Sequence, residues 1–184
     1  MFSYKVSSEI YLRLLTMQDV DAVYSLTVES RSHLRKWLPW VDDVQSPSRT
    51  EAFIRGALEQ FAANEGFQSG IWWKDAMVGC VGINTIDWSN RAGVVGYWLG
   101  DTFQGRGIMT QAVKAVIDIG FQHYGLNKME VRVATGNTKS SAIPRRLGFH
   151  EDGIIRHDEW LYDHFVDSYV FSMLASEWLP SQEV

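Results

Sequence analysis

The sequence predicts a mixed α/β fold, of the α+β kind, in which a mostly antiparallel sheet is flanked by helices. The middle of the chain holds three short apolar runs separated by short polar turns, which is typical of an antiparallel meander. Segments with the helical spacing of apolar residues lie before and after these runs. The 184 residues are 46% hydrophobic, with no repeat, low-complexity stretch or long Pro/Gly-rich linker. We therefore expect one domain over residues 1–184.

The N-terminal third predicts one strand followed by three helical segments. Apolar and polar residues alternate from Ile10 to Leu15, and Thr16 can cap the helix that follows. Ser46-Pro47 places serine at a cap and proline at the first helical position, which marks the start of another helix. The expected bounds are a strand over 10–15, helices over about 19–30 and 46–63, and a short helical segment over 31–40.

The remaining elements follow from turn residues and from periodicity. Lys74-Asp75 separates two apolar runs, and Gly148 lies where a helix would end in the left-handed conformation. The expected strands cover about 67–73, 77–86, 92–99, 128–134, 150–156 and 167–174, and the expected helices cover about 107–124 and 137–147.

Composition limits the class of protein. Cys80 is the single cysteine, so no internal disulfide can form, and its apolar strand predicts a core residue. The N-terminus does not resemble a signal peptide, and no apolar run approaches the roughly 20 residues that span a bilayer. The five histidines lack the tight spacing of metal ligands. We expect a cytoplasmic protein without a metal and without a membrane partner.

Charge is distributed unevenly along the chain. Residues 103–150 contain seven basic and two acidic residues, whereas the rest of the chain contains ten basic and twenty acidic ones. The net charge of −5 argues against nucleic-acid binding. The basic segment suits a polyanionic small molecule and the acidic remainder a cationic partner, although ordinary solvated faces would explain the same distribution.

A candidate anion site lies where the strand over 92–99 leads into a helix. Gly105-Arg106-Gly107 immediately precedes that helix, so that backbone N–H groups can converge on one point beside the positive end of its dipole. Thr110 replaces the third glycine of a dinucleotide-binding fingerprint, and the G-K-[ST] of a nucleoside triphosphate loop is absent. A tight turn without a ligand remains the alternative.

A second segment, from Asn137 to Gly153, completes a recognisable combination. Asn137 and Ser140 open a helix that closes at Leu147-Gly148-Phe149, although Asn137 could be simply a helix cap. With the opening strand over 10–14 and Leu34-Arg-Lys-Trp-Leu-Pro39, these segments resemble the GNAT superfamily of acetyl-CoA-dependent N-acetyltransferases, in its RimJ/RimL-type branch. The resemblance covers nearly the whole chain. One departure is Thr102, where the superfamily usually has glutamine or arginine.

The resemblance implies a coenzyme A site. The pyrophosphate would lie on the backbone amides of residues 104–110, and the pantetheine would run beside the strand ending at Trp98-Leu99. Asn137 would hold the pantetheine, and Lys139 or Arg145 would reach the ribose phosphate. The implied cofactor-binding residues are Trp98, Leu99, Gln104, Gly105, Arg106, Gly107, Ile108, Met109, Thr110, Asn137, Lys139, Ser140 and Arg145.

The resemblance also assigns catalytic and substrate residues. Glu159 matches the family's base and Ser140 its proton donor to the departing thiol, with a backbone N–H near Leu99 as a candidate oxyanion donor. A solvated carboxylate and a helix-cap serine are the respective alternatives. Aromatic neighbours of Glu159 could raise its pKa by desolvation. His33, Trp37 and Trp40 are candidate substrate contacts, and the family's habits suggest a homodimer.

The acceptor amine stays open between several classes. An α-amino group has a pKa of about 7.7–8.0 and is neutral in roughly one molecule in ten at pH 7, whereas a lysine amine at about 10.4 is almost fully protonated. One carboxylate base therefore suits a protein N-terminus, such as that of a ribosomal protein. The alternatives are a polyamine, an antibiotic or another small amine, or a non-catalytic acyl-CoA-binding sensor.

Overall fold

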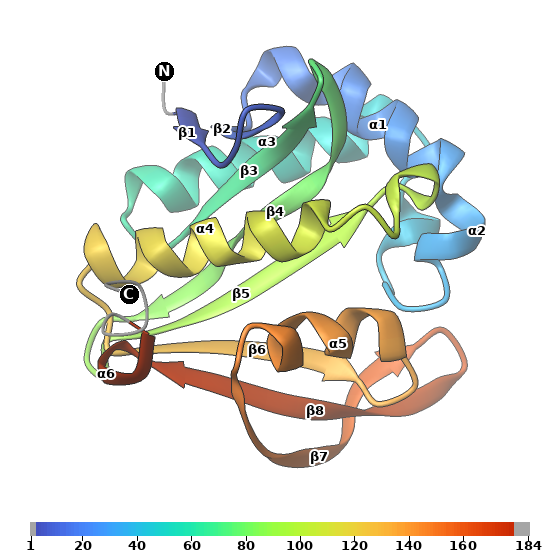
Figure 1. Ribbon diagram of the computed structural model, residues 1–184. Coiled ribbons are helices and arrows are strands. Elements are labelled where there is room, and N and C mark those ends of the chain that lie inside the picture. The colour runs from blue at the N-terminus through green and yellow to red at the C-terminus, as the bar shows by residue number, and fades with distance from the viewer. Residues whose placement is uncertain (1–2, 179–184) are drawn as a thin grey trace.

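The computed structural model describes residues 3–178, and within them one eight-stranded sheet organises the chain (Figure 1). The strand order is β1-β2-β3-β4-β5-β6-β8-β7, and every neighbouring pair is antiparallel except β5 and β6. The strands are β1 (Ser3–Lys5), β2 (Ile10–Leu14), β3 (Phe67–Trp73), β4 (Ala76–Asp87), β5 (Ala92–Leu99), β6 (Lys128–Ala134), β7 (His150–Leu161) and β8 (His164–Leu174). The predicted fold class, a mostly antiparallel sheet flanked by helices, is confirmed.

Helices cover both faces of the sheet. α4 packs on one face against β2, β4, β5 and β6, whereas α1 and α3 pack against β4 and β3 on the other. α5 contacts β6 and α4. The helices are α1 (Val20–Glu29), α2 (Arg31–Leu34), α3 (Pro47–Ala62), α4 (Ile108–Gln122), α5 (Thr138–Arg146) and α6 (Ala175–Trp178), with 3-10 turns η1 (Met17–Asp19), η2 (Val41–Asp43) and η3 (Asp101–Phe103). None of the helices in residues 3–178 has the length and apolarity needed to cross a bilayer.

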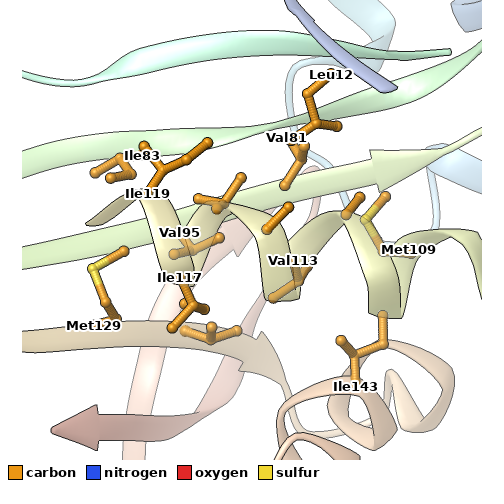
Figure 2. Close-up of a cluster of buried hydrophobic side chains, with 14 of the residues drawn as sticks. Leu12, Val81, Ile83, Val95, Met109, Val113, Ile117, Ile119, Met129 and Ile143 are labelled. Atoms are coloured by element: carbon orange, nitrogen blue, oxygen red, sulfur yellow. The ribbon is translucent and has the colours of Figure 1, made fainter. Parts of the chain in front are cut away.

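The larger core lies between α4 and the sheet (Figure 2). Val113 and Ile117 of α4 are fully buried and face strand residues such as Val81 and Val95. Each such side chain contributes roughly 1.5–3 kcal/mol by leaving water. This core fixes the start of α4 relative to the end of β5.

The smaller core lies on the opposite face, under α1 and α3. It contains Leu26, Ile54 and Cys80, with Trp98 packed against it. Cys80 is 2% exposed and burial raises the pKa of its thiol, which confirms it as a core residue. The two cores therefore hold opposite faces of β4 and β5.

β5 and β6 pair over only part of their length. Their parallel pairing joins 92–95 to 128–131, and no pairing continues over 96–99 and 132–134. The two strands thus separate toward their carboxyl ends. In an α/β sheet, such a separation at the carboxyl ends of parallel strands is a usual place for a ligand.

Three elements differ from their predicted bounds. The second helical segment, expected over 31–40, is α2 over Arg31–Leu34 and then an irregular loop leading to η2, because Pro39 cannot continue a helix. The last two strands extend beyond the expected 150–156 and 167–174 and meet in a hairpin at residues 162–163. β1 and α6 were not predicted, since three- and four-residue elements carry little periodic signal.

Candidate active site

Two cavities meet where β5 and β6 separate. The first has a volume of about 1040 Å³ and lies between the end of β5, the start of α4 and α5. The second, of about 940 Å³, lies on the α1 and α3 side of the sheet and reaches β7. Six residues line both cavities: Trp37, Leu38, Tyr97, Trp98, Asn137 and Ser140. A group in one cavity can therefore reach a group in the other at this junction.

The start of α4 forms a backbone cradle in the first cavity. Gly105 and Gly107 both have φ of +73°, in the left-handed region, and Gly107 is the N-cap of the helix. No side chain caps this end, so the first N–H groups of α4 have no side-chain acceptor and can donate to a ligand. A Cβ at either glycine would meet nothing within 4 Å, so glycine is needed here for its backbone conformation rather than for space. The loop has an uncapped helix start and two left-handed glycines, and an anion site at this place stays a prediction.

Cationic and amide side chains surround the cradle. Lys139 Nζ donates to Gln104 Oε1 at 3.1 Å, and Gln104 Nε2 lies 2.8 Å from His33 Nε2. Arg146 Nη1 donates to Thr110 Oγ1 at 2.8 Å, which ties α5 to the first turn of α4. This positive field beside free N–H groups suits a phosphate-bearing ligand.

Arg145 departs from the prediction. Its guanidinium donates to Glu151 and Ser141, both contacts at 2.8–2.9 Å, and stacks over Tyr169. It does not line the first cavity, whereas its neighbour Arg146 does. The correction arises because adjacent residues of a helix point about 100° apart, and the sequence does not reveal which one faces the cavity.

Ser140 occupies the junction because two contacts fix the first turn of α5. Asn137 Oδ1 accepts from Ser140 N at 3.2 Å, so Asn137 does act as a helix cap, and both side chains line the two cavities. Tyr97 Oη donates to the Ser140 carbonyl at 3.1 Å. Burial raises the pKa of Tyr97 to about 12, so the phenol stays neutral and keeps this hydrogen bond.

Glu159 reaches the second cavity through an irregularity in β7. The β7–β8 register shifts between Ile155 and Glu159, which are paired with Ser168 and Val166, so β7 carries extra residues there. His157 adopts φ of +51° inside this bulge, and its N–H donates to Asp167 Oδ1 at 2.8 Å. Bulges of this kind re-aim side chains at functional sites.

The electrostatic surroundings of Glu159 favour its protonated form more than water does. Burial is the larger cause that raises its pKa, and the neighbouring Asp158 carboxylate raises it further. Asp158 lines the same cavity and lies 3.9 Å from Arg132 Nη1. A carboxyl group with a raised pKa, placed in a cleft, is a candidate proton acceptor.

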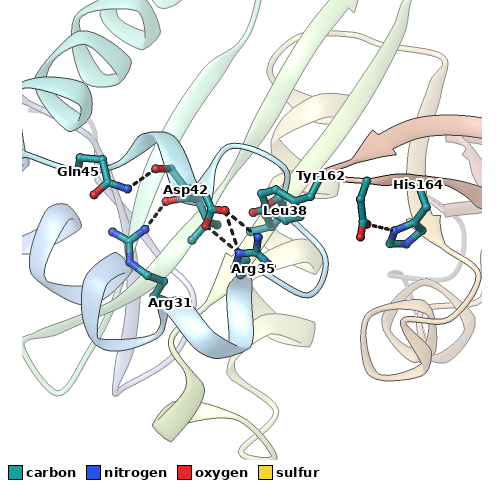
Figure 3. A network of polar contacts seen from close by, with 9 residues as sticks. Arg31, Arg35, Leu38, Asp42, Gln45, Tyr162 and His164 are labelled. Carbon is teal, nitrogen blue, oxygen red and sulfur yellow. Dashed lines mark hydrogen bonds and ion pairs between the residues drawn. The ribbon is translucent and has the colours of Figure 1, made fainter.

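The loop between α2 and α3, residues 35–46, carries Trp37 and Leu38, which line both cavities, and we call it the roof loop. Side chains hold it from two sides (Figure 3). Arg31 donates to the carbonyls of Val41 and Val44, and Arg35 pairs with Asp42 at 2.9 Å. From the β7–β8 turn, Tyr162 Oη donates to the Leu38 carbonyl at 2.6 Å.

The same tyrosine contacts the roof a second time. The Arg35 guanidinium lies 4.0 Å from the centre of the Tyr162 ring, a cation–π contact. The loop that carries Trp37 and Trp40 is therefore attached both to α2 and to the β7–β8 turn. We call the Tyr162 contacts with Leu38 and Arg35 the roof latch.

Most residues selected from the sequence come together around the junction. Every predicted cofactor residue except Arg145 lines the first cavity, Glu159 and Trp40 line the second, and Trp37 and Ser140 line both. His33, expected as a substrate contact, lines the first cavity and not the second. The sequence did not identify Tyr97, Arg146 or Asp158 as site residues, although each is adjacent to a residue that it did identify.

A family model described as "Acetyltransferase (GNAT) domain" matches residues 9–150. The chain belongs to the GNAT acetyltransferase family. It is 31% identical to the "Putative ribosomal N-acetyltransferase YdaF" of Bacillus subtilis (strain 168), over 97% of this chain and 98% of that protein. It is 26% identical to the "Ribosomal-protein-serine acetyltransferase" of Escherichia coli (strain K12), over 92% and 95% of the two chains.

The structural comparison agrees with these relatives. A solved structure of "RimL- Ribosomal L7/L12 alpha-N-protein acetyltransferase in complex with Coenzyme A" aligns with a TM-score of 0.91 and 25% identity, covering 94% of this chain and 98% of that one. This GNAT protein is thus an N-acetyltransferase of the RimL/RimJ type in fold and family. Within residues 3–178, no three His, Cys, Asp or Glu side chains come together as a metal site.

Proposed function

We propose that this GNAT enzyme transfers the acetyl group of acetyl-CoA to the α-amino group of a protein N-terminus, with a ribosomal protein as the substrate. The observation that carries the proposal is the meeting of the two cavities, with Ser140 on both and Glu159 in the second. The named relatives support it, since their descriptions include ribosomal-protein acetylation and the aligned RimL structure contains coenzyme A.

The first cavity fits coenzyme A by its chemistry. The uncapped start of α4 and the two left-handed glycines offer converging N–H donors, and Arg106, Lys139 and Arg146 add positive charge around them. A pyrophosphate carries the negative charge that such a cradle stabilises. We propose Arg146, in place of Arg145, as the side chain that reaches the ribose phosphate together with Lys139.

Acetyl-CoA supplies an activated acetyl group as a thioester. Glu159, with its raised pKa, is placed to take a proton from the incoming amine, directly or through a water molecule. Ser140 lies on the wall shared by the two cavities, where its hydroxyl can donate a proton on the sulfur side. Trp37 and Trp40 close the roof, and exclusion of water strengthens the electrostatic interactions of these groups.

The test is an acceptor panel. Purified protein is incubated with acetyl-CoA and with N-terminal peptides, spermidine or an aminoglycoside, and free thiol is measured. We expect the fastest release with the peptides, and mass spectrometry of ribosomal proteins from cells with and without the gene would then identify the modified terminus. Tight coenzyme A binding with thiol release at background for every acceptor would instead favour a sensor.

Assembly and location belong to the same proposal. We propose a cytoplasmic enzyme, since its relatives are described by ribosomal-protein substrates, and a homodimer, which light scattering would measure directly. β7 is the edge of the sheet and exposes Ile154 and Trp160, and an edge with apolar side chains is prone to association.

A further inference from the structure

Asn84 leaves the strand ladder on the wall of the second cavity. Ile83 is paired with Val95 and Thr85 with Val94, so Asn84 is an extra residue of β4 with no partner in β5. Its side chain is exposed and lines the second cavity. A bulge beside a ligand site commonly re-aims a side chain.

Gly96 makes room for this side chain. A Cβ built at Gly96 would lie 2.3 Å from Asn84 Nδ2 and 2.5 Å from Asn84 Oδ1, closer than side-chain atoms can approach. The φ of Gly96 is not in the left-handed region. Glycine is therefore required here for space, and that space is occupied by the Asn84 amide.

Two glutamines fix the orientation of that amide. Gln68 Nε2, from β3, donates to Asn84 Oδ1 at 2.9 Å, and Gln60 Nε2, from α3, donates to the Asn84 backbone carbonyl. Both contacts use oxygen atoms of Asn84. Its Nδ2 has no acceptor among residues 3–178, so two N–H donors stay available at the cavity wall.

The distance from the junction suits a short peptide. Gly96 and Trp98 lie two residues apart on the same face of β5, which corresponds to about 7 Å along a strand. Trp98 lines the shared wall of the two cavities. An extended peptide advances roughly 3.3–3.6 Å per residue, so a carbonyl within about two residues of the reacting amine falls near Asn84.

From this geometry we propose that Asn84 Nδ2 donates a hydrogen bond to a carbonyl oxygen of the acceptor, and so selects an amine followed by a peptide bond over a polyamine. The protonated nitrogens of a polyamine at neutral pH are donors only and cannot accept this bond. The inference rests on the proposed function and narrows its acceptor class. Asn84 is a specificity-determining residue, and Gln60, Gln68 and Gly96 position it.

Two substitutions test the bond. Asn84→Asp keeps an oxygen acceptor for Gln68 but loses the N–H donors, and Asn84→Leu removes the polar group without adding charge. Asn127→Asp is the matched control for charge, because Asn127 is exposed and lines neither cavity. Circular dichroism and thermal melting of each variant show whether it is folded.

The measurement is calorimetric affinity of the coenzyme A-loaded protein for a Ser-Ala-Ala amide peptide and for spermidine. A hydrogen bond of ordinary strength predicts that Asn84→Leu lowers the ratio of peptide affinity to spermidine affinity about three- to tenfold. Asn84→Asp should lower it at least as far, because its carboxylate in the cavity also attracts the polycation. We expect Asn127→Asp to leave the ratio unchanged. An unchanged ratio in either folded Asn84 variant would overturn the inference, as would wild-type protein that binds spermidine but not the peptide.

A parallel assay of thiol release separates the two proposals. Wild-type protein that binds the peptide without releasing thiol would contradict the acetyl transfer, while the affinity ratio would still decide the role of Asn84. Conversely, rapid peptide acetylation with an unchanged ratio in the variants would keep the transferase and reject Asn84 as its selector.

Discussion

The two cavities differ in how the chain builds them. The first is formed largely by residues 97–99 and 103–111 together with one face of α5, and its central feature is backbone N–H groups at a helix start. The second is formed by side chains from α1, α3, the roof loop and strands across the sheet. The first therefore depends on a few backbone angles, whereas the second depends on contacts between distant segments. Substitutions in one cavity should therefore change its own binding or kinetic constant and leave that of the other cavity nearly unchanged.

The largest expected effect comes from Glu159→Gln, which removes the proposed base from the second cavity and leaves the first intact. We expect kcat to fall by roughly 10²–10⁴ with the Kd for coenzyme A unchanged, because loss of a general base has this magnitude. Steady-state kinetics and calorimetry measure the two quantities. Glu51→Gln, on the exposed face of α3, is the control. A wild-type kcat would remove Glu159 from the mechanism.

A large effect on the first cavity is expected from Gly107→Val. A β-branched residue at φ of +73° is strained, so the loop should shift and the N–H donors diverge. We expect the Kd for coenzyme A to rise at least tenfold. Gly125→Val is a matched control, since Gly125 has φ of +64°, equally open surroundings and no part in either cavity. Equal Kd values for the two variants would contradict the cradle.

A smaller effect is expected from Tyr162→Phe, which removes the hydrogen bond of the roof latch and retains the ring beneath Arg35. A single hydrogen bond contributes about 0.5–1.5 kcal/mol, so KM for the acceptor should rise about two- to tenfold. The Kd for coenzyme A should change less. Tyr24→Phe is the control, because its hydroxyl contacts the Gln45 carbonyl at the limiting distance of 3.5 Å. Equal KM values in both variants would argue against a role for the latch.

The smallest effect is a shift in pH dependence on Asp158→Asn. The charge of Asp158 raises the pKa of Glu159, so its removal should lower that pKa. A base acts in its deprotonated form, and the acidic limb of kcat/KM should therefore move to lower pH. Burial, the larger cause of the raised pKa, is unchanged in this variant. The pKa that the acidic limb reports should therefore stay above that of an ordinary glutamate. A limb that moves to higher pH, or stays fixed, would contradict this coupling.

The backbone cradle at the start of α4 is a feature that residues close together in the sequence can predict. Gly105-Arg106-Gly107 and the helix after it are consecutive, so the sequence alone predicts converging N–H groups there, and both glycines have left-handed angles in the structure. The cap at Asn137 and the turn at Gly148 were readable for the same reason, because helix ends depend on residues a few positions apart. The fold class followed from periodicity in the same way.

Only the tertiary structure decided which side chains face the two cavities. Whether Arg145 or Arg146 faces the first cavity depends on how α5 rotates against the sheet, and the direction of Glu159 depends on a bulge in which the His157 N–H donates to Asp167 of the neighbouring strand. The position of the Asn84 side chain at the cavity wall depends on Gly96 of β5, because a side chain at that residue would occupy the same space. Local sequence sets backbone angles and periodicity, but the direction of a side chain in a cleft follows from packing between segments that are remote in the chain.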